Sequence, residues 1–306
     1  MANMFLEYHE NNVRETTFSS SIGQLSYSIE FFKNYLIKDI KVLDLQNFIN
    51  SLDLKPSTLR LVFTKVKQVF NFGNDIAEVI NYRPNFNKVI LPKTVSKVRN
   101  DILTEDEINS ILDDYKDTVY YYIFKFALLT GMRKGEILAL TWDKIDFEKN
   151  VIIVNKNLNG FKKLTLPKNN SSIREVPMSN LLKDLLLELK EFIKIKINYS
   201  LDGENIIISE NNELDFLFRN EYGEFITTTK IDTIFAWNYK RKYHFHQFRH
   251  YFATKLINSG IPIAEISKIL GHAEISTTLK MYVGTNNSEN ITNKLDKIFG
   301  QQMDNK

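Results

Sequence analysis

A proline-containing basic stretch divides this chain into two parts with different sequence patterns. Residues 82–100 contain Pro84 and Pro92 together with scattered lysines and arginines, and they lack helical periodicity. A stretch of this kind favours an extended, solvated connection. The chain has 306 residues, which is enough for two domains of ordinary size. We therefore predict a first domain over residues 1–81, a linker over residues 82–100 and a second domain over residues 101–306.

The first domain has the pattern of a helical bundle. Apolar residues recur at helical spacing from Ile22 to Ile37, and a second stripe follows Pro56, a residue that favours the first turn of a helix. Such stripes are typical of buried helix faces. Lys65 and Lys67 leave two interpretations open, a surface that faces DNA or an ordinary solvated one.

The second domain alternates helical and strand patterns. Thr104 precedes Glu107 by three residues, a capping box that predicts a helix start. The fold class is therefore predicted as mainly α with a small antiparallel β-sheet. The predicted helices are 105–113, 118–129, 133–140, 181–195, 229–238, 246–258, 262–270 and 276–283. The predicted strands are 151–154 and 164–166 around the turn Asn159-Gly160, with a third at 173–177, and residues 205–208 are either another strand or part of a loop.

Composition excludes several classes of protein. The absence of cysteine excludes disulfides and thiolate metal sites. The first residues do not resemble a signal peptide, and no apolar run is long enough to span a bilayer, so we expect a cytoplasmic protein. The net charge of +3 and pI of about 8.7 are only mildly basic. Residues 155–174 and 238–250, however, contain basic and no acidic residues, which suits either a phosphate-binding face or a solvated one.

Two segments combine arginine with a group that could assist phosphate chemistry. Arg133 follows Gly131 at a predicted helix start, and Glu136 lies three residues later, where it could orient the guanidinium. An ordinary surface ion pair is the alternative. His246 and Arg249 also share a helix face, and together suit phosphoryl transfer.

The other histidines of this second segment have a different interpretation. A metal site formed by His244, His246 and His250 is disfavoured, because neither cysteine nor an acid lies near them. His250 is better interpreted as a packing residue.

The last segment runs from Pro262 to Tyr282. Pro262 suits a helix start, Gly271 suits its C-terminal cap, and His272 follows directly. Tyr282 ends a short predicted helix. A lone tyrosine is usually a half-buried core residue, and this chain has 14, so Tyr282 gains significance only from its neighbours.

Together these segments resemble the signature motifs of the tyrosine recombinase (phage integrase) family. The matching segments are Thr130-Gly131-Met132-Arg133-Lys134-Gly135-Glu136, His246-Gln247-Phe248-Arg249-His250, Leu270-Gly271-His272 and Ser276-Thr277-Thr278 up to Tyr282. Each motif is weak alone, whereas their order and spacing are specific. The step from His272 to Tyr282 is similar to that of conjugative-transposon and Gram-positive phage integrases. Phe248, where leucine is usual, is a departure that should affect only packing.

The resemblance implies a metal-free DNA strand transferase without cofactors. Arg133 and Arg249 would clamp the scissile phosphate, with Glu136 in support, and His272 would donate a hydrogen bond to it. His246 would assist proton transfer at the nucleophile Tyr282, which would form a 3′-phosphotyrosyl link. Lys168 would protonate the departing 5′ hydroxyl, although Lys162 and Lys163 lie on the same predicted hairpin.

The resemblance also implies partners and leaves alternatives. Residues 1–81 would be a core-binding domain, and we expect the protein to bind double-stranded DNA at recombination sites as a homotetramer, with accessory factors, in the nucleoid. No arm-binding segment is seen before the first helices, and the sequence leaves open whether the natural protein lacks one. The tail helix predicted at Asn286–Phe299 would dock on a neighbouring protomer or on its own domain.

Integration or excision of a mobile element is expected. The alternatives are Xer-type resolution of chromosome dimers and a DNA-binding regulator that does not cleave.

Overall fold

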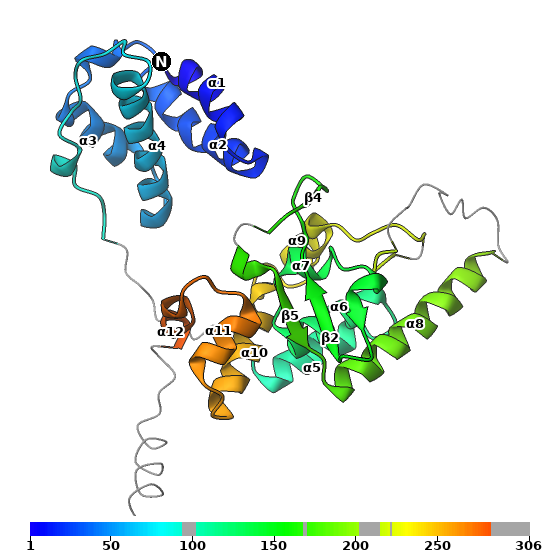
Figure 1. Cartoon of the computed structure of the whole chain (residues 1–306). Coiled ribbons are helices and arrows are strands. Elements are labelled where there is room, and N and C mark those ends of the chain that lie inside the picture. The colour runs from blue at the N-terminus through cyan, green and yellow to red at the C-terminus, as the bar shows by residue number, and fades with distance from the viewer. Residues whose placement is uncertain (94–101, 168–169, 202–214, 221, 283–306) are drawn as a thin grey trace, which may run out of the picture. The chain divides into compact units, whose positions relative to one another are not determined.

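The chain forms two compact units, each with its own hydrophobic core. The computed structural model describes residues 1–93, 102–167, 170–201, 215–220 and 222–282 (Figure 1). One unit comprises Met1–Lys97 and the other Val98–Lys306. The division falls inside the stretch 82–100 that sequence analysis assigned to a linker. Each unit is described by itself.

The first unit is helical. Its α-helices are α1 (Ala2–Asn12), α2 (Glu15–Phe31), α3 (Val42–Ser51) and α4 (Pro56–Asp75), and short 3₁₀ turns occur at Ile37–Asp39 and Phe86–Lys88. Pro56 occupies the first turn of α4, as predicted. The helix predicted to run to Ile37 instead ends at Phe31. Leu36 lies beyond the end of α2 and is 62% exposed, so it does not belong to the buried face of that helix, which includes Leu25.

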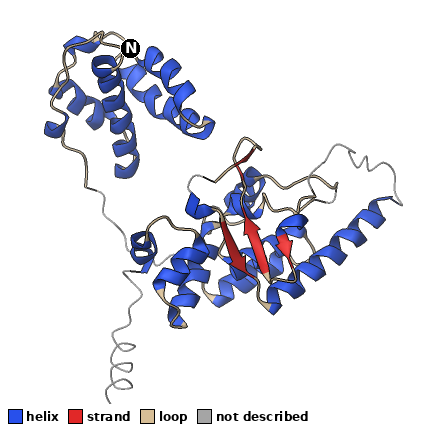
Figure 2. Ribbon diagram, in the orientation of Figure 1, coloured by secondary structure: helices blue, strands red, loops and turns tan. Residues whose placement is uncertain are grey.

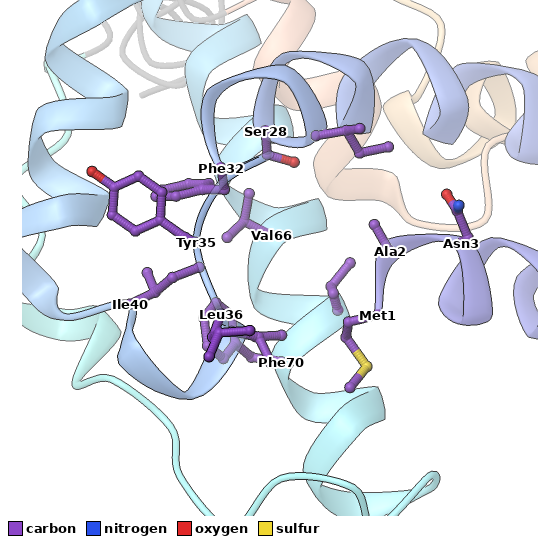
Figure 3. Close-up of a pocket in the computed structure, with 13 residues that line it drawn as sticks. Met1, Ala2, Asn3, Ser28, Phe32, Tyr35, Leu36, Ile40, Val66 and Phe70 are labelled. Atoms are coloured by element: carbon purple, nitrogen blue, oxygen red, sulfur yellow. The ribbon is translucent and has the colours of Figure 1, made fainter.

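Helix α4 is the central element of this unit. It packs against both α1 and α2, and its buried face includes Val62, Phe63 and Phe70. An apolar pocket of about 440 Å³ lies beside α4, between it and the residues at the start of α1 and the end of α2 (Figure 3). Phe32, Val66 and Phe70 line it. Packing of an apolar α4 stripe therefore supplies the core that the sequence pattern predicts.

Two small antiparallel sheets belong to the second unit (Figure 2). One has the strand order β1 (Ile145–Asp146), β2 (Val151–Val154), β5 (Arg174–Pro177), and the other pairs β3 (Asn157–Leu158) with β4 (Leu164–Thr165). The prediction that 151–154 and 164–166 flank one turn was wrong in its pairing. Residue Ile152 lies opposite Val176 of β5, and both are buried, so an apolar pair selects this register.

The helices of the second unit cover much of its described length. They are α5 (Glu105–Asp114), α6 (Val119–Thr130), α7 (Lys134–Ile137), α8 (Asn180–Leu201), α9 (Thr228–Trp237), α10 (His246–Asn258), α11 (Ile263–Leu270) and α12 (Ile275–Tyr282), with 3₁₀ turns at Trp142–Lys144 and Asn170–Ser172. The capping box at Thr104 and Glu107 is present. Helix α7 is shorter than predicted, and Arg133 is its N-cap residue rather than part of its first turn.

Helix α6 lies at the centre of this unit's core. It packs against α5, α8 and α10, and the ring of Phe124 contacts the rings of Phe235, Phe245 and Phe248. Phe248 is fully buried, so its ring is part of this core. Helix α10 packs on α11, which in turn packs on β5 and α12 (Figure 1). Helices α10 and α12 and strand β5 therefore all contact α11.

Some predicted features fall outside the described residues. They are residues 205–208, for which strand and loop were both left open, and the tail helix predicted at Asn286–Phe299. Among the residues that are described, no helix combines the length and apolar character needed to cross a membrane.

The close packing around Gly131 predicts that a larger residue there destabilises the fold. Gly131 has φ of +61°, and a Cβ there would lie 2.3 Å from the ring of Phe252. We expect Gly131→Ala to lower the free energy of unfolding by about 2–4 kcal/mol, from left-handed strain and overpacking together. The control is Gly260→Ala, where φ is +82° but nothing lies within 4 Å, so only about 1 kcal/mol should be lost. Equal losses in urea denaturation would show that the Phe252 contact is unimportant.

Candidate active site

Arg133 enters the site at a sharp change of backbone direction. Helix α6 ends at Gly131, whose left-handed conformation lets the chain turn at once into α7. The backbone N–H of Arg133 donates to Oε2 of Glu136 at 2.9 Å, and its Nη1 donates to Oε1 at 2.8 Å. Its side chain is 36% exposed. The carboxylate thus fixes both the backbone and the guanidinium of Arg133, while the side chain stays partly exposed.

Glu136 is a buried carboxylate shared by two arginines. It is 3% exposed, and Nη1 and Nη2 of Arg174 on β5 donate to Oε1 and Oε2 at 3.2 and 2.9 Å. Burial alone raises the pKa of Glu136. The hydrogen bond and charge of Arg174, followed by the charge of Arg133, outweigh burial, so the pKa lies below its usual value. Glu136 is therefore ionised near neutral pH.

Arg249 is the most enclosed cation of the site. It projects from α10, is 1% exposed, and donates to the carbonyl oxygens of Gly131 at 2.8 Å and Leu270 at 2.7 Å. These carbonyls lie at the C-terminal ends of α6 and α11, where helix geometry leaves carbonyl groups without intrahelical partners and the dipole favours a cation. Arg249 therefore ties the ends of two helices together.

Arg133 and Arg174 reach the same end of α11. Nη2 of Arg133 donates to the carbonyl of Gly271 at 2.9 Å, and Nε of Arg174 donates to that of Ile269 at 2.6 Å. Three successive carbonyl groups, from Ile269 to Gly271, therefore accept hydrogen bonds from three arginines of distant sequence position.

His272 follows directly from this turn. Its Nε2 lies 2.8 Å from Nη2 of Arg249, and its Nδ1 lies 2.8 Å from Oγ1 of the buried Thr278 on α12. Arginine has no acceptor, so Nε2 must accept and the ring proton must sit on Nδ1. Burial, then the charges of Arg249 and Arg133, lowers the pKa of His272 to about 4. The ring is therefore neutral near pH 7.

His246 is the first residue of α10 and is exposed. Its ring lies edge-on to the ring of His250, with 4.8 Å between the ring centroids. The charge of His246 is also one of the causes that lower the pKa of His272. His246 is therefore close to the His272 side of the site. Within the described ranges, which include His244, His246 and His250, no cluster of acidic and histidine side chains is arranged to bind a metal.

Two predicted site residues lack a described side chain. Lys168 lies outside the described residues, and Tyr282 is described only as the last residue of helix α12. Tyr282 is four residues after Thr278, whose hydroxyl contacts His272. The structure thus brings together Arg133, Glu136, Arg249 and His272 and places the helix that ends in Tyr282 against them.

Sequence reasoning missed Arg174 and Thr278. Arg174 was noticed only as part of a basic stretch, and Thr278 only as part of a motif. The partner of Arg174 is 38 residues away, so no helical or strand spacing could indicate it.

Comparisons with known proteins match both units. The sequence pattern of the phage integrase family matches residues 101–289, and that of the SAM-like N-terminal domain of phage integrases matches residues 1–52. A tyrosine recombinase XerC-like protein of Caldanaerobacter subterraneus subsp. tengcongensis is 29% identical over 80% of this chain and 68% of its own length. The ICEBs1 integrase of Bacillus subtilis is 25% identical over 85% and 70%.

Solved structures show the same fold. The Tn1549 transposon integrase in complex with transposon right end DNA has a TM-score of 0.71 and 21% identity, covering 97% of this chain and 98% of that chain. A lambda integrase dimer bound to a COC′ core site has a TM-score of 0.67 and 16% identity, covering 94% and 79%. Mainly helical architecture with small antiparallel sheets was predicted from the sequence and is confirmed.

The contacts of His272 predict how this residue titrates. The chain has five histidines, so their ring signals can be resolved by NMR and His272 assigned from a His272→Gln variant. We expect His272 to stay neutral as pH falls from 8 and to titrate near 4, because burial and Arg249 disfavour its charged form. In the folded protein the pKa of His272 lies below the usual 6.5, so the neutral ring makes its full contribution to the free energy of unfolding above pH 6.5. This contribution is lost as the pH falls toward 4. A midpoint between 6 and 7 would contradict the Arg249 contact.

Proposed function

The chain belongs to the phage integrase family, and we propose that it cuts and rejoins DNA through a covalent bond between Tyr282 and a 3′ phosphate. The observation that carries this proposal is the convergence of Arg133, Arg249 and His272 at the end of α11, beside the helix that ends in Tyr282. Guanidinium and imidazole groups gathered in this way suit the charge of a phosphate in its transition state.

Arg133 is the most exposed of the three arginines at this site. Two of its five guanidinium N–H groups are used by Glu136 and Gly271, and a side chain 36% exposed can present others to a phosphate. Its fixed planar fork suits two non-bridging oxygens at once. Arg133 is therefore proposed as the first arginine of the phosphate clamp.

Arg249 and His272 are proposed to exchange partners when DNA binds. A phosphate oxygen beside Arg249 would replace Nε2 of His272 as the acceptor of its N–H group. His272 could then carry its proton on Nε2 and donate it to the phosphate. The hydroxyl of Thr278 supports either tautomer, because it can both accept from Nδ1 and donate to it.

The proposed reaction conserves phosphodiester bonds. The phenol oxygen of Tyr282 attacks phosphorus and gives its proton to His246. The bond from phosphorus to the 5′ oxygen breaks, and Lys168 protonates that oxygen. The products are a 3′-phosphotyrosyl link and a free 5′ hydroxyl, and the reverse steps on another strand rejoin the DNA. Since the covalent link retains the bond energy, the scheme requires no nucleotide cofactor.

Integration or excision of a mobile element is the favoured process. The ten-residue step from His272 to Tyr282 supports it over Xer-type chromosome-dimer resolution. We propose duplex recombination sites as the substrate, a homotetramer on DNA as the active assembly, and accessory factors as partners. A regulator of the same fold would bind such sites and form no covalent product.

The nucleophile is tested by Tyr282→Phe. Wild-type protein incubated with a nicked half-site duplex from the element's end should form a covalent complex that persists in denaturing gels. Tyr282→Phe should abolish it, since removing the phenol oxygen removes the bond, and should leave DNA binding within about threefold. Tyr222→Phe, at a 63% exposed tyrosine, is the control and should react normally. A persistent adduct in Tyr282→Phe would assign the nucleophile elsewhere.

The clamp is tested by Arg249→Lys. Lysine keeps the charge but lacks the planar fork that joins Gly131, Leu270 and a phosphate, so the single-turnover rate of adduct formation should fall about 100-fold or more. Affinity for DNA should change little. Arg219→Lys is the control, at an arginine that also donates to two backbone carbonyls but has the carboxylate of Asp215 as its third partner. A rate within threefold of wild type would remove Arg249 from the reaction.

A further inference from the structure

Arg174 is a buried arginine with no role in the scheme above. Its side chain is 5% exposed on β5, and its guanidinium donates to the carbonyls of Ser172 and Ile269 as well as to both oxygens of Glu136. A buried ion pair is costly to desolvate and is often replaced by apolar residues without loss of stability. Folding alone therefore does not explain why this position is charged.

The charge of the cluster suggests a reason. Glu136 is the orienting carboxylate of Arg133, but a carboxylate paired with one arginine also cancels that arginine's charge. Because Arg174 pairs with the same carboxylate, the group of Arg133, Arg174, Arg249 and Glu136 carries a net charge of +2. That charge matches the dianion formed when a phenolate adds to a phosphodiester.

Arg174 also lies directly against the turn that presents His272. A Cβ added to Gly271 would meet Nη1 of Arg174 at 2.9 Å and its Cδ at 3.0 Å. Nε of Arg174 donates to the carbonyl of Ile269, two residues earlier. Loss of this side chain would therefore remove a hydrogen bond from the end of α11 as well as two from the carboxylate of Glu136.

We propose that Arg174 is a positioning residue, which saturates Glu136 so that the carboxylate orients Arg133 without neutralising it, and which fixes the end of α11 ahead of His272. This inference rests on the proposed function, because its effect is on formation of the covalent adduct. Arg174 does not touch the phosphate. It acts through Glu136 and the backbone of the Gly271 turn.

The experiment measures single-turnover adduct formation at saturating half-site DNA. The rate constant reports the geometry of the site, whereas the amplitude reports the fraction of protein that is folded and active. Arg174→Met should lower the rate constant about 100-fold. Arg174→Lys keeps the charge without the planar fork, so it guards against misfolding of the Met variant, and it should lower the rate constant about tenfold. The matched control Arg219→Met also removes an arginine from backbone carbonyls and a carboxylate, and should change only the amplitude.

A double-mutant cycle tests the route through Glu136. In a Glu136→Gln background, Arg174→Met should lower the rate constant of adduct formation by less than about fivefold, because Glu136 no longer carries a negative charge that Arg174 must balance. Equal costs in both backgrounds would overturn this route. A wild-type rate constant with reduced amplitude in the Arg174 variants would make the residue merely structural. If wild-type protein formed no adduct, the proposed function itself would fail, which is a different result.

Discussion

The C-terminal end of α11 is the interaction on which the rest of the site depends. Helix geometry leaves its last carbonyl groups without intrahelical partners, and those of Ile269, Leu270 and Gly271 accept from Arg174, Arg249 and Arg133 respectively. Each arginine comes from a different element, so one helix end joins β5, α10 and the loop before α7. Negative partial charge at this end also offsets the repulsion among three cations. The same turn then presents His272, whose lowered pKa follows from burial and from this crowding.

In the proposed reaction, the protein's own cations would stabilise the phosphate. The protein supplies fixed cations whose geometry is set before DNA binds, so little reorganisation is needed during the reaction. Glu136 is the only carboxylate bonded to these arginines among the described contacts, and sharing it between Arg133 and Arg174 keeps a surplus of positive charge. The helix that ends in Tyr282 is anchored to this cluster through Thr278 and His272. Membership of the phage integrase family fits this arrangement.

The sequence predicted much of this because its strongest signals are local. Helix α10 was predicted with its observed bounds, Gly271 was predicted as a cap, and Arg133, Glu136, Arg249 and His272 were identified as site residues before the fold was known. Pairing of β2 with β5 was missed, because strand register depends on partners far along the chain. Arg174 was missed for the same reason, since its role lies in a contact with Glu136 that no spacing encodes. The roles of Lys168 and Tyr282 still rest on the family resemblance.

The central claim is that these side chains meet on one phosphate. The most direct measurement is a structure of the protein bound to a duplex that contains its cleavage site. We expect Arg133, Arg249 and His272 each to lie within hydrogen-bond distance, about 2.7–3.2 Å, of oxygens on the same phosphate. Arg249 bonded only to the carbonyls of Gly131 and Leu270, or arginines that contact phosphates of different nucleotides, would contradict it.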